Sequence, residues 1–316
     1  MEEITILDGY LYFVLGGALL SALLFVLVHI KNRPFAFAAA ALVLGAVFGA
    51  ALSKGMFMIC KMTYTLSEGF VGTLTDMHPS RFSFFGGALG ACLGAVIAGR
   101  TSDLTMGESL DVFAPWGVLT AAVARAGEFL LGTFGCGRYF DPEENPFLCR
   151  LPFCLPVRYE WDDTYVEYYL AVFIMEAFFA FIVFLVSVLY FRRHPHCFAR
   201  SVFYLCLGQI LFQSLLTENY VWHEFVKVEQ LFSMLVMEGV LLWHWPHSGK
   251  NRGTGLPPLL ALLSAGVFVA CEFFLDKPIP FTDGFELPHL ATYGIMLLGM
   301  LLLAWCEHRA YRKHTA

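Results

Sequence analysis

The feature that most constrains this chain is a series of about nine apolar segments, each close to the roughly 20 residues that a helix needs to cross a bilayer. They cover residues 10–29, 35–58, 82–98, 112–134, 166–190, 202–216, 228–245, 256–274 and 290–305. The sequence therefore predicts an all-α fold, a polytopic integral membrane helical bundle with about nine transmembrane helices.

Composition excludes several other classes of protein. Hydrophobic residues make up 58% of the chain and charged residues 15%, which is untypical of a soluble domain. The net charge is −6, and lysine and arginine lie at segment ends, so no nucleic-acid partner is predicted. The N-terminus, MEEITILD, is acidic where a signal peptide is basic, so we expect the first segment to be retained. The nine cysteines show no CxxC pair or zinc spacing, and no metal or cofactor is predicted.

The distribution of basic residues predicts the orientation. Alternate connections hold eleven lysines and arginines on one side and seven on the other. By the positive-inside rule, the N-terminus should face out and the C-terminus the cytoplasm. The long connection 135–165 is then extracytoplasmic, and its acidic residues are expected to form a solvated face. It holds Cys136, Cys149 and Cys154, which allow a disulfide without selecting the pair; free thiols are an equal alternative.

The most unusual polar group is Arg125, which lies in an apolar run with Glu128 three residues later. On a helix, this spacing places both side chains on one face. An arginine in hydrocarbon costs at least about 2.5–3.5 kcal/mol, so it is usually buried, paired and functional. Gly127 and Gly132 lack side chains beside it and allow a backbone or a lipid headgroup to approach. The alternative is a structural Arg–Glu pair that locks two helices together.

Five polar groups on four predicted helices share one depth. Each lies in the outer half of its segment, Arg125 at about 14 Å below the outer surface at 1.5 Å per residue. A single polar cavity open to the outer leaflet would explain this agreement, and the phosphate of an anionic lipid suits a fixed guanidinium. The five groups are Arg125, Glu128, Glu176, Lys54 and Gln213.

Several motifs, in order, resemble the prolipoprotein diacylglyceryl transferases. RAGEFLLG (125–132) resembles the RxGNFxNGE signature of that family, and SFFGGALG (83–90) resembles its SFHGGLxG segment. VFIMEA (172–177) is similar to its QLYE helix. GQILFQSL (208–215) and FVKVEQLFS (225–233) resemble its YGxxRFxxE and xSxGQxxS segments. Glycines four apart, at 45 and 49 and at 86, 90 and 94, also permit close helix packing.

The resemblance implies a bacterial inner-membrane enzyme that moves the diacylglyceryl group of phosphatidylglycerol to a cysteine thiol of a secreted lipoprotein precursor. It implies Arg125 as the essential arginine and Glu176 as the glutamate of the QLYE helix. We expect Arg125 to bind the phosphate and Glu128 or Glu176 to act as acid or base. Expected substrate-binding residues are Lys54, Ser83, Gly86, Gly87, Gly127, Gln213 and Gln230.

The chain also departs from the family. Phe85 replaces its histidine, and Leu211 stands where a second arginine is expected. Residues 1–249 are predicted to form the transferase-like core and residues 250–316 an additional helical pair. The alternative is a non-catalytic lipid-binding or assembly protein on the same scaffold. A transporter is less favoured, because there is no inverted repeat.

Overall fold

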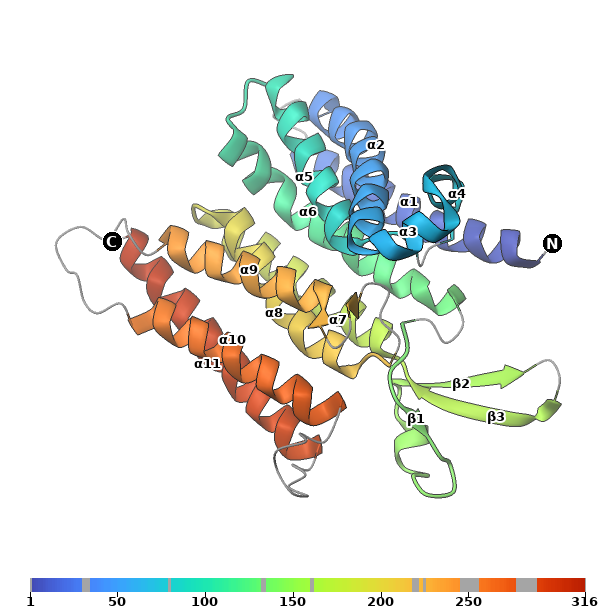
Figure 1. Cartoon of the computed structure of the whole chain (residues 1–316). Helices are drawn as coiled ribbons and strands as arrows, with labels where there is room; N and C mark the ends of the chain where they lie inside the picture. Colours follow the sequence, from blue (N-terminus) through green and yellow to red (C-terminus); the bar gives the residue numbers. More distant parts are fainter. Residues whose placement is uncertain are drawn as a thin grey trace. The chain divides into compact units, whose positions relative to one another are not determined.

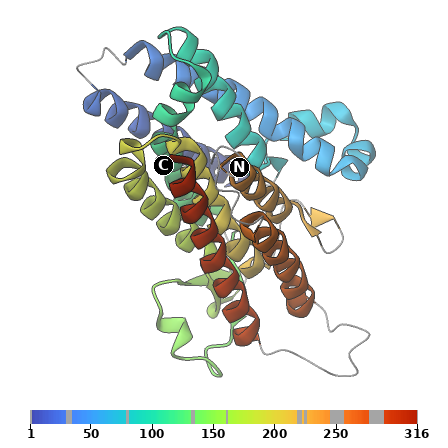
Figure 2. The same ribbon diagram turned by 90° about the vertical axis from the view of Figure 1, so that its left-hand side faces the viewer.

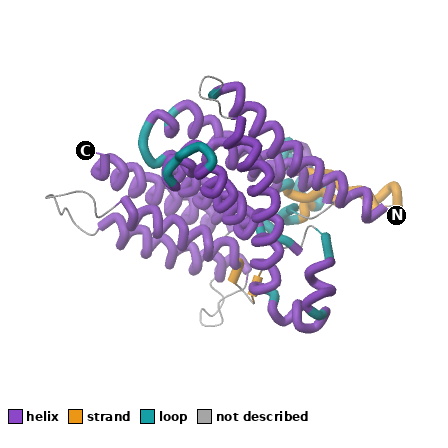
Figure 3. The backbone as a smooth tube through the Cα atoms, turned by 90° about the horizontal axis from the view of Figure 1, so that it is seen from above, coloured by secondary structure: helices purple, strands orange, loops and turns teal. Residues whose placement is uncertain are grey.

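The computed structural model describes residues 2–29, 35–78, 81–131, 135–159, 162–217, 222–223, 226–244, 256–276 and 289–315. Helices dominate this part of the chain, with a few short strands (Figure 3). The chain divides into two compact units. The first holds residues 1–201 and 215–221, and the second holds residues 202–214 and 222–316.

The first unit contains seven of the helices. Three pairs pack against each other: α2 with α5, α1 with α6, and α6 with α7. Figure 1 shows α2 and α5 side by side. The helices are α1 (Glu2–Val28), α2 (Phe35–Cys60), α3 (Met62–Glu68), α4 (Phe70–Thr75), α5 (Phe84–Arg100), α6 (Met106–Ala126) and α7 (Val172–Leu189).

The glycine row of α5 makes the contact with α2. A side chain at Gly90 would collide with the carbonyl of Phe48, and one at Gly94 would lie 2.5 Å from the backbone nitrogen of Gly45. Gly86 meets the carbonyl of Leu52 in the same way. The predicted close packing along this row is confirmed. These three glycines are therefore covered by the backbone of α2.

A small antiparallel sheet interrupts the helices of the first unit. It contains β1 (Tyr139–Phe140), β2 (Cys154–Tyr159) and β3 (Asp162–Leu170) in the order β1-β3-β2. Tyr139 pairs with Tyr169, and β2 pairs with β3 along its length. The predicted transmembrane segment 166–190 was wrong at its start, because residues 166–170 form the end of β3. Aromatic and β-branched residues suit a strand as well as an apolar helix.

The second unit contains most of α8 (Cys197–Leu215), a small ladder of β4 (Trp222–His223) and β5 (Val226–Lys227), and three further helices. These are α9 (Val228–His244), α10 (Leu256–Asp276) and α11 (His289–Thr315). The helices α10 and α11 pack along each other, and both contact α9 (Figure 2). Phe268 of α10 and Met296 of α11 are fully buried in this unit.

Five helical segments in the described residues are long and apolar enough to cross a membrane. Two shorter apolar helices, Phe84–Arg100 and Leu259–Glu272, accompany them. The helix α6 is not among the five; it carries Glu108, Asp111 and Arg125. The protein is thus a helical bundle with the apolar helices of a membrane protein. The five segments are Gly9–Val28, Phe35–Cys60, Val172–Arg193, Cys197–Leu215 and Ala291–Arg312.

Candidate functional site

The first unit contains a buried cluster of three charged side chains. Arg125 lies in the last turn of α6, Glu128 in the 3₁₀ turn Gly127–Leu131 that follows, and Glu176 in the second turn of α7. The Nη1 atom of Arg125 lies 2.7 Å from Oε1 of Glu128, and its Nε atom lies 2.8 Å from Oε2 of Glu176. All three residues are buried, with 7%, 4% and 4% of their surfaces exposed. We call these residues the ion triad.

The surroundings of the ion triad fix its geometry. The ring of Phe84 covers the guanidinium of Arg125, with its centroid 4.5 Å from Cζ. A side chain at Gly127 would lie 2.5 Å from Cβ of Phe13, so glycine lets α1 approach here. Gly135 has a φ of +76°, and a side chain on it would lie 2.7 Å from Oε2 of Glu128. Gly127 therefore leaves space for Phe13 of α1, and Gly135 leaves space for the buried carboxylate of Glu128.

The chain after the 3₁₀ turn joins the ion triad to the sheet. The backbone nitrogen of Phe173 donates to the carbonyl of Gly135 (3.1 Å), and that of Gly137 donates to the carbonyl of Leu170 (2.7 Å). Only Ala171, which is fully buried, separates β3 from α7. Glu176 thus lies on a helix that continues directly from the sheet.

Ser83 and Gly86 take part in helix packing. The hydroxyl of Ser83 caps α5 by accepting a hydrogen bond from the backbone nitrogen of Gly86 at 3.3 Å. The Ser53 hydroxyl of α2 donates to the carbonyl of Ser83 at 2.6 Å. At Gly87, by contrast, a side chain would make only ordinary contacts, 3.8 Å from Ser53. Substrate binding by Ser83, Gly86 and Gly87 stays a prediction.

Lys54 makes its own set of contacts. Its ammonium group donates to the carbonyl of Asp76 and lies 4.7 Å from the ring centroid of Phe82. It is buried, with 5% of its surface exposed. These partners belong to the segment that leads into α5, so Lys54 ties α2 to that segment. Its role in binding a phosphate stays a prediction.

Gln213 and Gln230 belong to the second unit, in a separate buried polar network. The side-chain nitrogen of Gln230 lies 2.8 Å from Oε1 of Glu272, 2.9 Å from Oγ of Ser214 and 3.0 Å from the carbonyl of Ile210. Ser214 also donates a hydrogen bond to Glu272. The network therefore joins α8, α9 and α10.

A buried lysine completes this network. Lys227 donates to the carbonyl of Gln213 at 2.8 Å, and its Nζ atom lies 3.5 Å from Oε2 of Glu272. The amide of Gln213 donates to Glu229 at 2.9 Å. Sequence analysis missed Lys227, Glu229 and Glu272 as site residues. The signal for Glu272 was its position in an apolar helix, which is the same signal that singled out Arg125.

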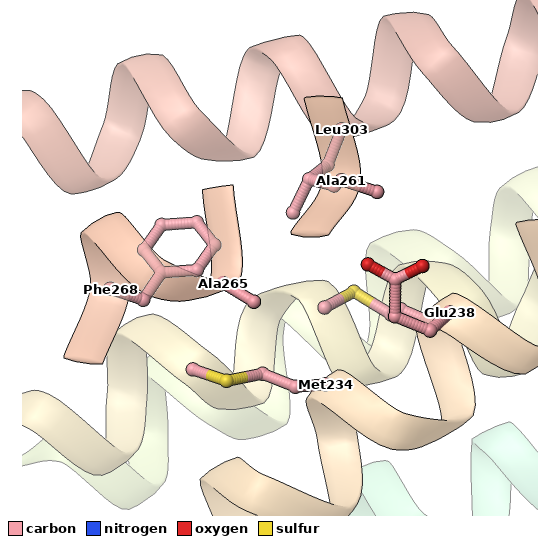
Figure 4. Close-up of a pocket in the computed structure, with 7 residues that line it drawn as sticks. Met234, Glu238, Ala261, Ala265, Phe268 and Leu303 are labelled. Atoms are coloured by element: carbon pink, nitrogen blue, oxygen red, sulfur yellow. The ribbon is translucent and has the colours of Figure 1, made fainter. Parts of the chain in front are cut away.

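A small cavity in the described part of the second unit lies between α9, α10 and α11 and is lined by Glu238 among apolar side chains (Figure 4). Its volume is about 10 Å³, enough for about one water molecule. It is too small for a lipid headgroup. The other lining residues are Met234, Met237, Ala261, Ala265, Phe268 and Leu303. The described residues contain no group of three or more histidine, cysteine or acidic side chains that is arranged to hold a metal ion.

The chain was compared with protein-family models, with curated proteins and with solved structures, and none of them matches. The geometry of the site and the motifs quoted above therefore carry the functional argument. Fold and site together define a helical membrane protein with a buried arginine that binds two carboxylates.

Proposed function

We propose that this chain is a membrane transferase that acts on a glycerophospholipid, with the ion triad as its reaction centre. The observation that carries the proposal is the placement of Glu128 and Glu176, from two different elements, against the guanidinium of Arg125. A buried arginine with two charge-assisted contacts is a fixed ligand for a phosphate group. The resemblance supports phosphatidylglycerol as donor and a lipoprotein-precursor cysteine, or a similar nucleophile, as acceptor.

In the proposed reaction, the lipid phosphate displaces one carboxylate from Arg125. That carboxylate, Glu128 or Glu176, removes the proton from the acceptor thiol. The thiolate attacks the carbon of the diacylglyceryl group that is bonded to the phosphate oxygen. A C–S bond forms there, and the bond between that carbon and the phosphate oxygen breaks. Glycerol phosphate leaves with the electron pair, and Arg125 balances its charge.

The test is turnover by purified protein in phosphatidylglycerol vesicles with a peptide that contains a lipobox cysteine. Mass spectrometry should detect the diacylglyceryl peptide and released glycerol phosphate. Arg125→Lys keeps the charge but loses the planar fork, so we expect turnover to fall at least tenfold. Arg81→Lys is the matched control, because Arg81 pairs with Asp76 at a site where both side chains are about one-third exposed. Wild-type protein that yields no product would refute the transferase.

The burial and the two ion pairs of Arg125 favour a second function. Arg125 is only 7% exposed and already holds two carboxylates, as in a non-catalytic protein in which they lock α6 to α7. Lipid that co-purifies with the wild type but not with Arg125→Lys, without turnover, would indicate a lipid-binding protein. No difference in lipid content would indicate a structural lock.

The proposal includes about nine membrane spans, with the N-terminus outside and the C-terminus in the cytoplasm. The apolar segments of the sequence support the number of spans, and the distribution of lysine and arginine supports the orientation. In a chain without the native cysteines, Glu143→Cys should react with a membrane-impermeant maleimide added outside the cell. Arg312→Cys should react when the same reagent is added on the cytoplasmic side. Labelling of position 143 only from the cytoplasmic side would overturn the orientation.

A further inference from the structure

The connection from β1 to β2, which is drawn in Figure 1, contains two cysteines. Cys149 lies in the 3₁₀ turn Leu148–Arg150, and Cys154 is the first residue of β2. Both are free thiols in this structure, their side chains interact with each other, and both are partly exposed. Both are therefore within reach of a soluble oxidant.

Backbone hydrogen bonds hold the chain between the two cysteines in a compact turn. The nitrogen of Leu151 donates to the carbonyl of Leu148 at 3.1 Å, and that of Cys154 donates to the carbonyl of Leu151 at 3.0 Å. At the far end, Cys154 pairs with Leu170 of β3. The sheet holds Cys154 in place, and the turn places Cys149 close to it.

The third cysteine of this region lies in a different environment. Cys136 is 1% exposed and packs with Ala171 and Phe173, where Leu155 and Tyr169 also cover it. This burial shields the Cys136 thiol from a soluble oxidant. Cys136 belongs to the core next to the ion triad.

We propose that Cys149 and Cys154 form a disulfide, a modification site in the sheet-bearing segment of the first unit. Each thiol loses its proton; one thiolate attacks an external disulfide and releases one external thiolate, and the second attacks the protein sulfur of the mixed disulfide and releases the other. An S–S bond forms in the protein, and the external disulfide is reduced to two thiols. The site is independent of the transferase proposal, but its oxidation in cells rests on the outward orientation of this segment.

The first experiment uses the full chain, purified in detergent, reduced, and then exposed to oxidised glutathione. Free thiols are alkylated, and peptides are mapped by mass spectrometry before and after reduction. We expect one linked fragment that contains both cysteines, lighter by two hydrogen atoms, and loss of alkylation at both sites. Linkage of either residue to Cys136, or full alkylation of both, would overturn the proposal whatever the lipid chemistry.

The second experiment alkylates the protein in intact cells with a membrane-permeant reagent. We expect both cysteines to be protected until a reductant is added. In Cys149→Ser, Cys154 should become alkylated without reduction, which shows that protection comes from the disulfide and not from burial. Wild-type protein whose two cysteines are both alkylated in cells without reduction would also overturn the proposal. Transferase turnover is measured separately, so the two proposals fail separately.

Discussion

Replacement of Arg125 by leucine should destabilise the protein far more than replacement of either of its partners by glutamine. Arg125→Leu leaves Glu128 and Glu176 buried, each with 4% of its surface exposed, and without the cation between them. Glu128→Gln or Glu176→Gln leaves the arginine with one carboxylate and removes the repulsion between the two. The ion triad therefore predicts an asymmetric set of effects.

The magnitudes follow from the contacts. Charge centres about 4 Å apart attract by about 4 kcal/mol at an effective dielectric constant of 20, and Arg125 has two such partners. Loss of one partner from a buried pair typically costs about 3–5 kcal/mol, which we expect for Arg125→Leu. A single Glu→Gln variant keeps one pair and a neutral acceptor, so we expect a loss of about 1–3 kcal/mol.

The assay is equilibrium unfolding in detergent, followed by tryptophan fluorescence. The double variant Arg125→Leu/Glu176→Gln should recover part of the stability lost in Arg125→Leu, because only one buried carboxylate then lacks its cation. The cycle gives a coupling free energy of opposite sign to the single effects. Equal losses for all three single variants, or a double variant with additive loss, would refute this account of the ion triad.

Three further predictions use other contacts. Gly90→Leu should reduce the free energy of unfolding by about 1–3 kcal/mol, because the new side chain overpacks α2 against α5. Gly87→Ala should leave the free energy of unfolding nearly unchanged. Equilibrium unfolding of the two variants is compared directly. Thr105 donates two hydrogen bonds to Glu108, and they lower the pKa of that carboxyl. The stabilisation from these hydrogen bonds is present at neutral pH and is lost as the pH falls through the lowered pKa. In Thr105→Ala, the melting temperature should therefore depend less on pH in the acid range. Glu272→Leu leaves a buried lysine without its carboxylate and should cost about 3–5 kcal/mol, more than Glu272→Gln, in the same unfolding assay.

The sequence best predicts those features whose alternatives would have a high free-energy cost in a membrane. An arginine and two glutamates in apolar segments must pair, and spacing and depth indicated that Arg125, Glu128 and Glu176 are close in space. The glycine row of α5 was predictable for a similar reason, because few residues allow two helix backbones to approach so closely. Whether these features serve catalysis does not follow from spacing alone.

Other features escaped because local sequence does not determine them. Residues 166–170, VEYYL, are aromatic and apolar enough to merge with the helix that follows, and only their pairing with β2 makes them part of a strand. Lys227 lies just before the predicted segment 228–245, and nothing nearby in sequence shows that Glu272 lies beside it. Gly127 was informative only in part, because its partner, Phe13, is more than a hundred residues away.

The junction between β3 and α7 has a mechanical consequence. A single buried residue, Ala171, joins the strand to the helix, and its nitrogen donates to the carbonyl of Phe153 at 2.7 Å. There is no linker to absorb a rotation of the sheet, so a twist applied at β3 must turn the first turns of α7 or break that hydrogen bond. Glu176 lies in those turns. A rotation of the sheet would therefore move the carboxylate of Glu176, because Ala171 alone connects β3 to α7.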